Sequence, residues 1–300
     1  METVIISGSS NHKLSASIAK FNKTKLAKVE IGRFPNKEKR IRILSDLKDK
    51  DVNIIQSTCI KPDEYLIETL LLADAAKRMG AKKITLVLPW FGYMPQDKVF
   101  LEGESLSSHV VIDFLNNSPI DEFDILDIHA KHLLEKFIKP VKHRSAMPLF
   151  VKHSKEKMKY KKGNLIAVAV DKGGLERAEE FSRGLGCGLV CFDKKRDNKT
   201  GEITFTDFYG SVEGKDVIAF DDYVSTGGTL IKSAQYLKGK GARSYTFCVT
   251  HIAVPKSLVN ICNKPTIDAI ITTNSIPFSI KSPKVVVLDL AGIYEFKYNN

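Results

Sequence analysis

The sequence is poor in the residues that stabilise or punctuate unusual folds. Its 300 residues include five cysteines, 11 prolines and 19 glycines, and glycine and proline at this level are typical of ordinary globular proteins. So few cysteines cannot form a disulfide framework, and no apolar run approaches the roughly 20 residues needed to span a bilayer. The composition therefore excludes disordered, collagen-like and coiled-coil classes.

Acidic residues are the minority among the charged ones. Lysine and arginine number 46, and aspartate and glutamate number 35, which gives a formal net charge of 46 − 35 = +11. This balance suits polyanionic partners, but the chain has neither a nucleic-acid-binding module nor aromatic residues interleaved with its basic clusters. We therefore expect no nucleic-acid partner. At roughly 150 residues per domain, the length predicts two domains.

The cysteines are scattered, each in or near an apolar stretch: Cys59, Cys187, Cys191, Cys248 and Cys262. The 187/191 pair has no second pair to complete a zinc site. The thiols therefore indicate small interior residues in a reducing compartment. The opening residues, METVIISGSS, lack the basic segment of a secretory signal. We expect a cytoplasmic protein that has no membrane partner.

Short runs rich in valine and isoleucine alternate with segments of helical period, which is the pattern of parallel sheets flanked by helices. The runs are continuously apolar, so these strands are expected to be buried on both faces. The expected strands are 4–7, 52–56, 84–89, 124–128, 165–170, 189–192, 217–220, 245–250, 269–272 and 285–288. The clearest expected helices are 63–79 and 229–238.

The two halves of the chain are similar in outline. The segments GAKKITLVLPW (80–90) and GARSYTFCVTH (241–251) each follow a helix and enter a strand, which is compatible with an internal duplication. Between the halves, residues 151–162 carry six lysines and a histidine. Such a run predicts a solvated helix or a domain junction. We expect one domain over 1–145 and a second over 146–300.

The most informative segment is VIAFDDYVSTGGT (217–229), in which an apolar strand is followed by two acids, paired glycines and a helix. Ligands of open parallel sheets bind beyond the carboxyl ends of the strands. Gly227 and Gly228 allow consecutive N–H groups to converge on an anion at a helix N-terminus. Because the loop lacks the lysine of a polyphosphate-binding loop, it predicts a sugar phosphate site, in which Asp221 and Asp222 accept hydrogen bonds from sugar hydroxyls.

Residues 221–229 resemble the phosphoribosyl-diphosphate-binding loop of type I phosphoribosyltransferases. Further segments in the expected order make the whole chain similar to the ribose-phosphate diphosphokinase family. They are GRFPNKEKRIRI (32–43), PWFGYMPQDKVFLEGESLSSHVV (89–111), LDIHA (126–130), AVDKGGLERA (169–178) and FDKKR (192–196). The resemblance implies an α/β protein of two similar type I phosphoribosyltransferase-like domains, each a mostly parallel sheet flanked by helices.

The resemblance also implies an activity. Members of this family transfer the terminal diphosphate of Mg-ATP to the C1 hydroxyl of ribose 5-phosphate and release AMP, so Mg²⁺ is the expected cofactor. ATP-binding segments are expected in the N-terminal domain and the ribose 5-phosphate loop in the C-terminal one. The family completes each ATP site across a subunit interface, which implies self-association into a dimer or larger homo-oligomer.

Several residues match the functional positions of the family. The catalytic pair is Lys194 and Arg196, within a polar segment, 193–202, that is expected to be mobile. The residues implied for ribose 5-phosphate are Asp171, Asp221, Asp222, Ser225, Thr226, Gly227, Gly228 and Thr229. Those implied for ATP are Phe34, Asn36, Glu38, Gln96, Asp97 and His129, and those implied for the metal are His129 and Asp171.

Read without the resemblance, the same residues have simpler interpretations. The 217–229 segment is consistent with a strand-to-helix turn that carries two solvated aspartates. Lys194 and Arg196 are consistent with a surface charge cluster, His129 with a capping histidine and Phe34 with a core residue of an edge strand. His132, three residues after His129, lacks the carboxylate spacing of a paired metal site.

The chain also departs from the family. Pro95 stands where many members have arginine, Glu102-Gly103-Glu104 replaces a more basic stretch, and Ser225 stands where the longer enzymes often have aspartate. The proline leaves open a catalytically silent paralogue that binds nucleotide and regulates an active partner. A base-using phosphoribosyltransferase is a third alternative, and it would need a hood over the 221–229 loop.

Overall fold

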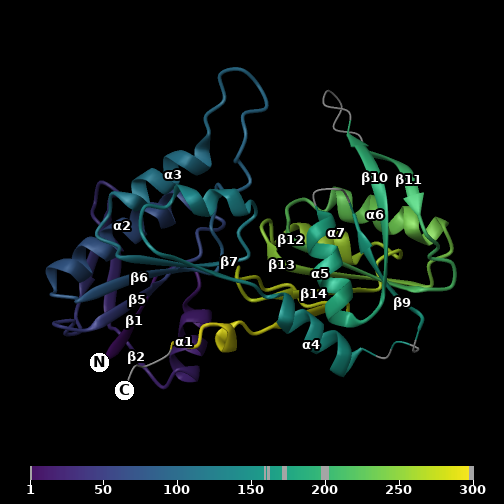
Figure 1. Cartoon of the computed structure of the whole chain (residues 1–300). Coiled ribbons are helices and arrows are strands. Elements are labelled where there is room, and N and C mark those ends of the chain that lie inside the picture. The colour runs from purple at the N-terminus through teal and green to yellow at the C-terminus, as the bar shows by residue number, and fades with distance from the viewer. Residues whose placement is uncertain (1, 159, 161–162, 171–173, 197–202, 297–300) are drawn as a thin grey trace. The chain divides into compact units, whose positions relative to one another are not determined.

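The computed structural model describes residues 2–158, 160, 163–170, 174–196 and 203–296, with the backbone alone for 192–196 and 203–209. The chain divides into two compact units. Unit 1 comprises Met1–Ser145, Ser275–Pro277 and Asp289–Asn300, and unit 2 comprises Ala146–Asn274 and Phe278–Leu288. Each unit is a sheet with helices packed against it (Figure 1).

The sheet of unit 1 is parallel throughout, in the order β2-β1-β5-β6-β7-β8. Its strands are β1 (Thr3–Ser7), β2 (Lys25–Leu26), β5 (Asp51–Ile55), β6 (Lys83–Leu88), β7 (Glu122–Leu126) and β8 (Val141–Arg144). The four central strands are buried along most of their length because both of their faces are covered. Their carboxyl ends therefore lie along one edge of the sheet.

Helices cover both faces of this sheet. Helix α1 (His12–Phe21) lies on one face, and α2 (Pro62–Arg78) and α3 (Ser107–Asn116) lie on the other (Figure 1). Helix α2 begins with a proline and two acids and ends with two basic residues, a distribution that favours the helix dipole. The 3₁₀ helices η1 (Lys131–Lys136) and η3 (Ala291–Ile293) complete the unit.

A separate hairpin packs against unit 1. Strands β3 (Val29–Arg33) and β4 (Lys39–Ile43) pair antiparallel in a two-stranded sheet of their own. Their residues alternate between half-buried and exposed, and Val29, Ile41 and Ile43 pack against the core shared with α2. Because no described residue joins this hairpin to the main sheet by ladder hydrogen bonds, side chains must fix its position.

The sheet of unit 2 has the order β11-β10-β9-β12-β13-β14-β15. Its strands are β9 (Leu165–Ala169), β10 (Gly188–Arg196), β11 (Ile203–Tyr209), β12 (Asp216–Val224), β13 (Ser244–Ile252), β14 (Ala269–Thr273) and β15 (Val285–Leu288). All described pairs are parallel except β10 with β11. Strand β12 therefore lies at the centre of a mostly parallel sheet.

Alternate residues of β12 face two helical layers. Val217 and Ala219 share a core with α6 (Gly228–Gly239) and α7 (Ser257–Cys262). Phe220 instead contacts Phe150 of α4 (Met147–Lys157) and Phe181 of α5 (Leu175–Leu185), with ring centroids 5.4 and 5.2 Å away. The central strand is thus buried on both faces, as the continuous apolar run predicts.

The predicted fold class is confirmed. Each of the ten expected strands is present, and the two expected helices correspond to α2 and α6 within one residue at each end. Strands β2, β3, β4, β8 and β11 were not among the expected ones. The lysine-rich run 151–162 begins in α4, whose lysines are exposed, which confirms the solvated helix.

The remaining composition-based expectations concern cysteines and membrane spans. All five cysteines are free; Cys59 and Cys248 are buried and the other three are half-buried. Burial raises the pKa of the Cys59 thiol to about 12, so this thiol is unreactive at neutral pH. In the part of the chain that the structure describes, no helix has the length and apolar character of a membrane span.

The core of unit 1 gives the first testable prediction. Phe123 is fully buried, and its ring centroid lies 4.8 Å from that of Phe137. Replacing it with alanine should lower the free energy of unfolding by about 3–5 kcal/mol, because the change leaves a cavity. Trp90 is the single tryptophan and is buried in unit 1, so its fluorescence during urea unfolding reports the loss.

The matched control is Phe100→Ala, in the segment between β6 and α3. The Phe100 side chain is 75% exposed, so its removal should change the unfolding free energy by less than about 1 kcal/mol. Equal losses for the two variants would contradict the assigned core.

Candidate active site

A tight loop joins β12 to α6 at the carboxyl end of the central strand of unit 2. Ser225 and Thr226 are exposed, Gly227 is left-handed with φ 81°, and α6 begins at Gly228. A Cβ atom at Gly227 would lie 2.5 Å from Ile261 Cδ1, so both the backbone angle and the available space require glycine. No described side chain caps the helix, so its first N–H groups are placed to bind an anion.

The two acids before this loop lie within β12 rather than after it. The expected strand ends at Phe220, but pairing with β13 continues through Asp221↔Val249 to Val224↔Ile252. The predicted boundary is therefore wrong by four residues. Within the extended strand the two acids differ in burial: Asp222 is buried, while Asp221 is half-exposed.

Arg177 of α5 binds both acids. Its Nη2 atom lies 3.2 Å from Asp221 Oδ1 and 3.1 Å from Asp222 Oδ1. The Asp221 oxygen also accepts the backbone N–H of Asp222 at 2.9 Å. One guanidinium thus compensates two carboxylates and fixes their orientation. The sequence analysis did not identify Arg177 as a site residue. Its position in the AVDKGGLERA segment was the one feature that could have indicated such a role.

Strand β10 carries Lys194 and Arg196. The segment 193–202 was expected to be a mobile loop, but its first four residues are a strand, in which Lys194 pairs with Phe205 and Arg196 with Ile203 of β11. Residues 197–202 lie outside the described residues, as does Asp171. Lys194 and Arg196 are two positions apart in an extended strand and so share one of its faces.

The hairpin turn of unit 1 carries the three expected adenine-site residues. Phe34 N–H donates to Glu38 O at 2.9 Å, and Asn36 Oδ1 accepts from Glu38 N–H at 3.2 Å. The Phe34 ring is 48% exposed, with the Arg40 guanidinium 6.0 Å from its centroid. Asn36 and Glu38 are also exposed. The turn therefore presents an aromatic face, an amide and a carboxylate to solvent.

A second loop of unit 1 carries Gln96 and Asp97. The turn closes through Gln96 N–H donating to Tyr93 O at 2.9 Å. Pro95 lies inside this turn, at a position where its missing N–H is not needed for the closing hydrogen bond. The Asp97 carboxylate lies 3.7 Å from His132 Nε2. The structure thus brings together two residues that sequence reasoning treated separately.

His129 follows β7 in a strained turn. Asp127 has a positive φ of 39°, and the next residue, Ile128, donates its N–H to His143 Nε2 at 3.2 Å. Because Nε2 accepts this hydrogen bond, His143 must be neutral. Desolvation lowers the pKa of the imidazole and so also favours the neutral form. His143 on β8 therefore helps to hold the turn that presents the half-buried His129.

The next question is whether these histidine and carboxylate side chains could bind the expected Mg²⁺. Among the described residues, no group of three or more histidine, cysteine, aspartate or glutamate side chains could hold an ion alone. Mg²⁺ commonly binds through one or two carboxylates together with substrate phosphates rather than in an all-protein cage. The carboxylates of the two units therefore fit Mg²⁺ that arrives with a phosphorylated substrate.

Two family models match the chain in sequence order. The model for the N-terminal domain of ribose phosphate pyrophosphokinase matches residues 3–118, and the phosphoribosyl transferase domain model matches residues 144–281. Together they span most of both units.

Named relatives extend the likeness over nearly the whole chain. A ribose-phosphate pyrophosphokinase of Helicobacter hepaticus is 35% identical over 290 residues, which cover 97% of this chain and 93% of the relative. One from Fusobacterium nucleatum is 32% identical and covers 97% and 92%. The crystal structure of phosphoribosylpyrophosphate synthetase from Mycobacterium smegmatis superposes with a TM-score of 0.87 at 26% identity and covers 97% and 96%.

The loop geometry predicts that one glycine is irreplaceable. Gly227→Ala should destabilise unit 2 by about 1–3 kcal/mol, because the left-handed backbone disfavours a Cβ and that atom would collide with Ile261. Hydrogen exchange of peptides from α6 and α7 measures the loss. Gly239→Ala is the control, since its Cβ would meet nothing within 4 Å; equal acceleration of exchange by both changes would rule out the steric explanation.

Proposed function

The chain belongs to the ribose-phosphate pyrophosphokinase family, and we propose that it transfers the diphosphate of Mg-ATP to the C1 hydroxyl of ribose 5-phosphate. The products are 5-phosphoribosyl 1-diphosphate and AMP. The observation that carries the proposal is the loop of unit 2, where a required glycine and the start of α6 follow two carboxylates on a central strand. This is the arrangement expected for a phosphorylated sugar.

The sugar phosphate binds at this loop. The 5-phosphate accepts hydrogen bonds from the hydroxyl and N–H groups of Ser225, Thr226 and Thr229, close to the glycines 227 and 228. Asp221 and Asp222 accept hydrogen bonds from the ribose hydroxyls, while Arg177 holds both carboxylates in place. Asp171 approaches the sugar and its metal ion. The loop offers donors to the phosphate and acceptors to the sugar, so it fits one orientation of the ligand.

ATP binds in unit 1. Adenine stacks on the exposed face of Phe34, with Asn36 and Glu38 at its polar edge, because an aromatic ring and an amide match the face and the edge of a purine. Gln96, Asp97 and His129 bind the phosphates and their metal ion. These groups come from the β3–β4 hairpin, the 93–97 turn and the end of β7.

The transfer forms a bond between the sugar O1 and the β-phosphorus of ATP, and it breaks the bond between that phosphorus and the bridging oxygen to the α-phosphate. AMP leaves with this oxygen, and the C1 hydroxyl loses its proton. Lys194 and Arg196 stabilise the charge that develops on the transferred group, as cations do in phosphoryl transfer. Bringing two polyanions together requires this compensation.

Asp171 would approach the sugar and its Mg²⁺, and His129 would help to hold the metal–ATP complex. When bound, Mg²⁺ neutralises phosphate charge and polarises the β-phosphoryl oxygens. The chain's own side chains orient the nucleotide and the sugar around it. The five free thiols support a reducing compartment such as the cytoplasm as the place of this reaction.

We also propose that two or more copies complete the ATP site. The hairpin turn leaves Phe34 half-exposed, and α2 and α3 expose Ile67, Val110 and Phe114. The last three residues line one apolar groove, and a contiguous exposed apolar surface commonly marks an interface. Light scattering should give a mass at least twice the 33.5 kDa of one chain; a monomer at assay concentration would contradict the shared site.

The decisive assay for the activity follows all nucleotide products. Purified protein is incubated with Mg-ATP and ribose 5-phosphate, and the products are separated by ion-exchange chromatography. AMP and 5-phosphoribosyl 1-diphosphate should appear in equal amounts. ADP in place of AMP would indicate an ordinary kinase, and bound ATP with no product would indicate a silent paralogue.

The catalytic pair gives a sharper prediction. Lys194→Ala and Arg196→Ala should each lower kcat by at least about 100-fold, with the KM for ribose 5-phosphate changed less than about 3-fold, because the two cations act on the transferred group. Lys195→Ala is the matched control, because it removes a lysine of the same strand to which no catalytic role is assigned. Losses of similar size at all three positions would contradict the assignment.

A further inference from the structure

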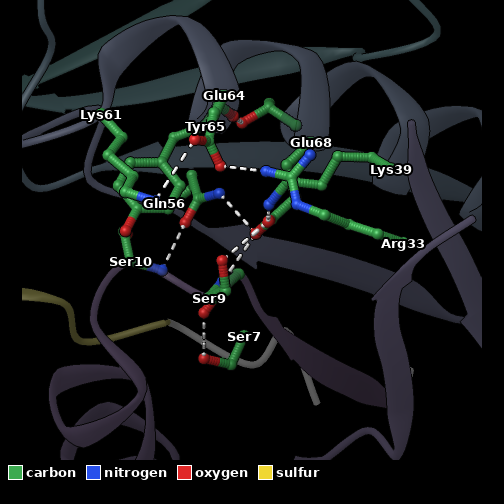
Figure 2. A network of polar contacts seen from close by, with 12 residues as sticks. Ser7, Ser9, Ser10, Arg33, Lys39, Gln56, Lys61, Glu64, Tyr65 and Glu68 are labelled. Carbon is green, nitrogen blue, oxygen red and sulfur yellow. Dashed lines mark hydrogen bonds and ion pairs between the residues drawn. The ribbon is translucent and has the colours of Figure 1, made fainter. Parts of the chain in front are cut away.

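A buried carboxylate in unit 1 ties the nucleotide-binding hairpin to the main sheet. Glu68 lies on α2 and is fully buried. Figure 2 shows its side chain among groups from three other segments: the residues after β1, the residue after β5 and the start of β4. No described ladder hydrogen bond joins the hairpin to the main sheet, so side-chain contacts such as those of Glu68 make the connection.

Four donors saturate this carboxylate. Oε1 accepts Ser9 N–H at 2.7 Å and Gln56 Nε2 at 2.8 Å, and Oε2 accepts Ser9 Oγ at 2.7 Å. The fourth donor is the Lys39 ammonium, which forms an ion pair with Oε2. A carboxylate offers about four lone-pair positions, so each is used.

The balance of these contacts keeps Glu68 charged. Burial alone would raise the pKa of its carboxyl, but hydrogen bonds from Lys39, Ser9 and Gln56 outweigh burial and lower the pKa below its usual value. Lys39 is itself only 11% exposed at its side chain. The ion pair is therefore shielded from solvent. Away from solvent, the attraction between the two charges is screened only weakly, so it strongly constrains their relative position.

Gln56 orients the carboxylate from the other side. Its Oε1 atom accepts Ser10 N–H at 3.2 Å while its amide nitrogen donates to Glu68. A Cβ at Gly8 would lie 2.2 Å from Gln56 Oε1, so the glycine between Ser7 and Ser9 makes room for this amide. The opening SGSS segment is thus explained by the network rather than by a ligand.

A second ion pair repeats the arrangement one helical turn earlier. Glu64 of α2 pairs with Arg33, the last residue of β3. Arg33 and Lys39 are cross-strand partners that close the hairpin at its turn. Two acids four residues apart on α2 therefore hold the two basic residues that flank the segment 34–38.

We propose that Glu68, acting through Lys39, is a positioning residue for the nucleotide: it holds the hairpin turn, and hence Phe34, Asn36 and Glu38, in the orientation that binds ATP. The inference rests on the proposed function. It adds that part of the affinity for ATP is set by residues that do not touch the nucleotide, because the Glu68–Lys39 pair is the buried one of the two ion pairs that hold the turn to α2.

The test compares the two Michaelis constants. Lys39→Met should raise the KM for ATP at least about 10-fold, with the KM for ribose 5-phosphate and the kcat at saturating ATP changed less than about 3-fold. Lys39→Arg retains the cation and should restore most of the affinity. A general loss of folding would not separate the two substrates or respond to a conservative replacement.

A second variant guards against misfolding caused by an unpaired buried charge. In the double variant Lys39→Met/Glu68→Gln, the buried charges are removed, while the amide can still bond Ser9 and Gln56. It should fold and show the same raised KM for ATP as Lys39→Met. The control is Arg42→Met/Glu30→Gln, which removes an exposed pair within the hairpin, 3.8 Å apart, and should leave both constants unchanged.

The outcomes separate the two levels of the claim. An active wild-type enzyme whose KM for ATP is unchanged in Lys39→Met and in the double variant would overturn the positioning role and leave the proposed function intact. Equal rises in both Michaelis constants would also overturn it. A wild-type protein that makes no 5-phosphoribosyl 1-diphosphate would instead contradict the function on which the inference rests.

Discussion

Each unit buries a carboxylate at the carboxyl end of its sheet, and the need to pair that charge organises the residues around it. Removing a carboxylate from water costs several kcal/mol unless cations and hydrogen-bond donors compensate it. Glu68 in unit 1 forms an ion pair with Lys39 of the hairpin, and Asp222 in unit 2 forms one with Arg177 of α5. In both cases the compensating cation comes from an element outside the sheet, and the pairing fixes that element where ligands of parallel sheets bind.

The two ion pairs have different structural roles. Arg177 bridges Asp222 and the half-exposed Asp221, so a buried charge orients a second carboxylate that remains open to a sugar. Glu68 orients no exposed acid; it anchors a hairpin whose turn displays an aromatic ring and an amide. The same electrostatic requirement thus shapes the surface proposed for the sugar in one unit and the surface proposed for the base in the other.

Local sequence patterns predicted most strands of the two main sheets, but they missed several edge strands and both strands of the hairpin. Continuous apolar runs identified the ten expected strands. The central ones are buried because both of their faces are covered, but the edge strand β15 exposes Val286 and Val287, so the expected burial is wrong there. The two hairpin strands have five residues each, and four of these ten residues are basic: Arg33, Lys39, Arg40 and Arg42. Such segments carry little apolar signal. The end of β12 was placed too early because Asp221 and Asp222 continue the ladder as polar residues.

Sequence patterns could not predict contacts between side chains that are far apart along the chain. Arg177 meets Asp221 across 44 positions, and Ser9 meets Glu68 across 59. The return of the chain's end to unit 1 is of the same kind: Tyr294 is fully buried there, and Asn22 bonds its carbonyl at 2.8 Å. The loop 221–229 could be interpreted early because its glycines, threonines and acids are contiguous.

The central claim is that unit 1 receives the nucleotide and unit 2 the sugar phosphate. Hydrogen exchange with each substrate alone tests it most directly. The account predicts that Mg-ATP slows exchange in the hairpin peptides covering residues 29–43, and that ribose 5-phosphate slows exchange around residues 221–230 and leaves the hairpin unaffected. Protection of the hairpin by ribose 5-phosphate, or of the 221–230 segment alone by ATP, would contradict the assignment of the two units.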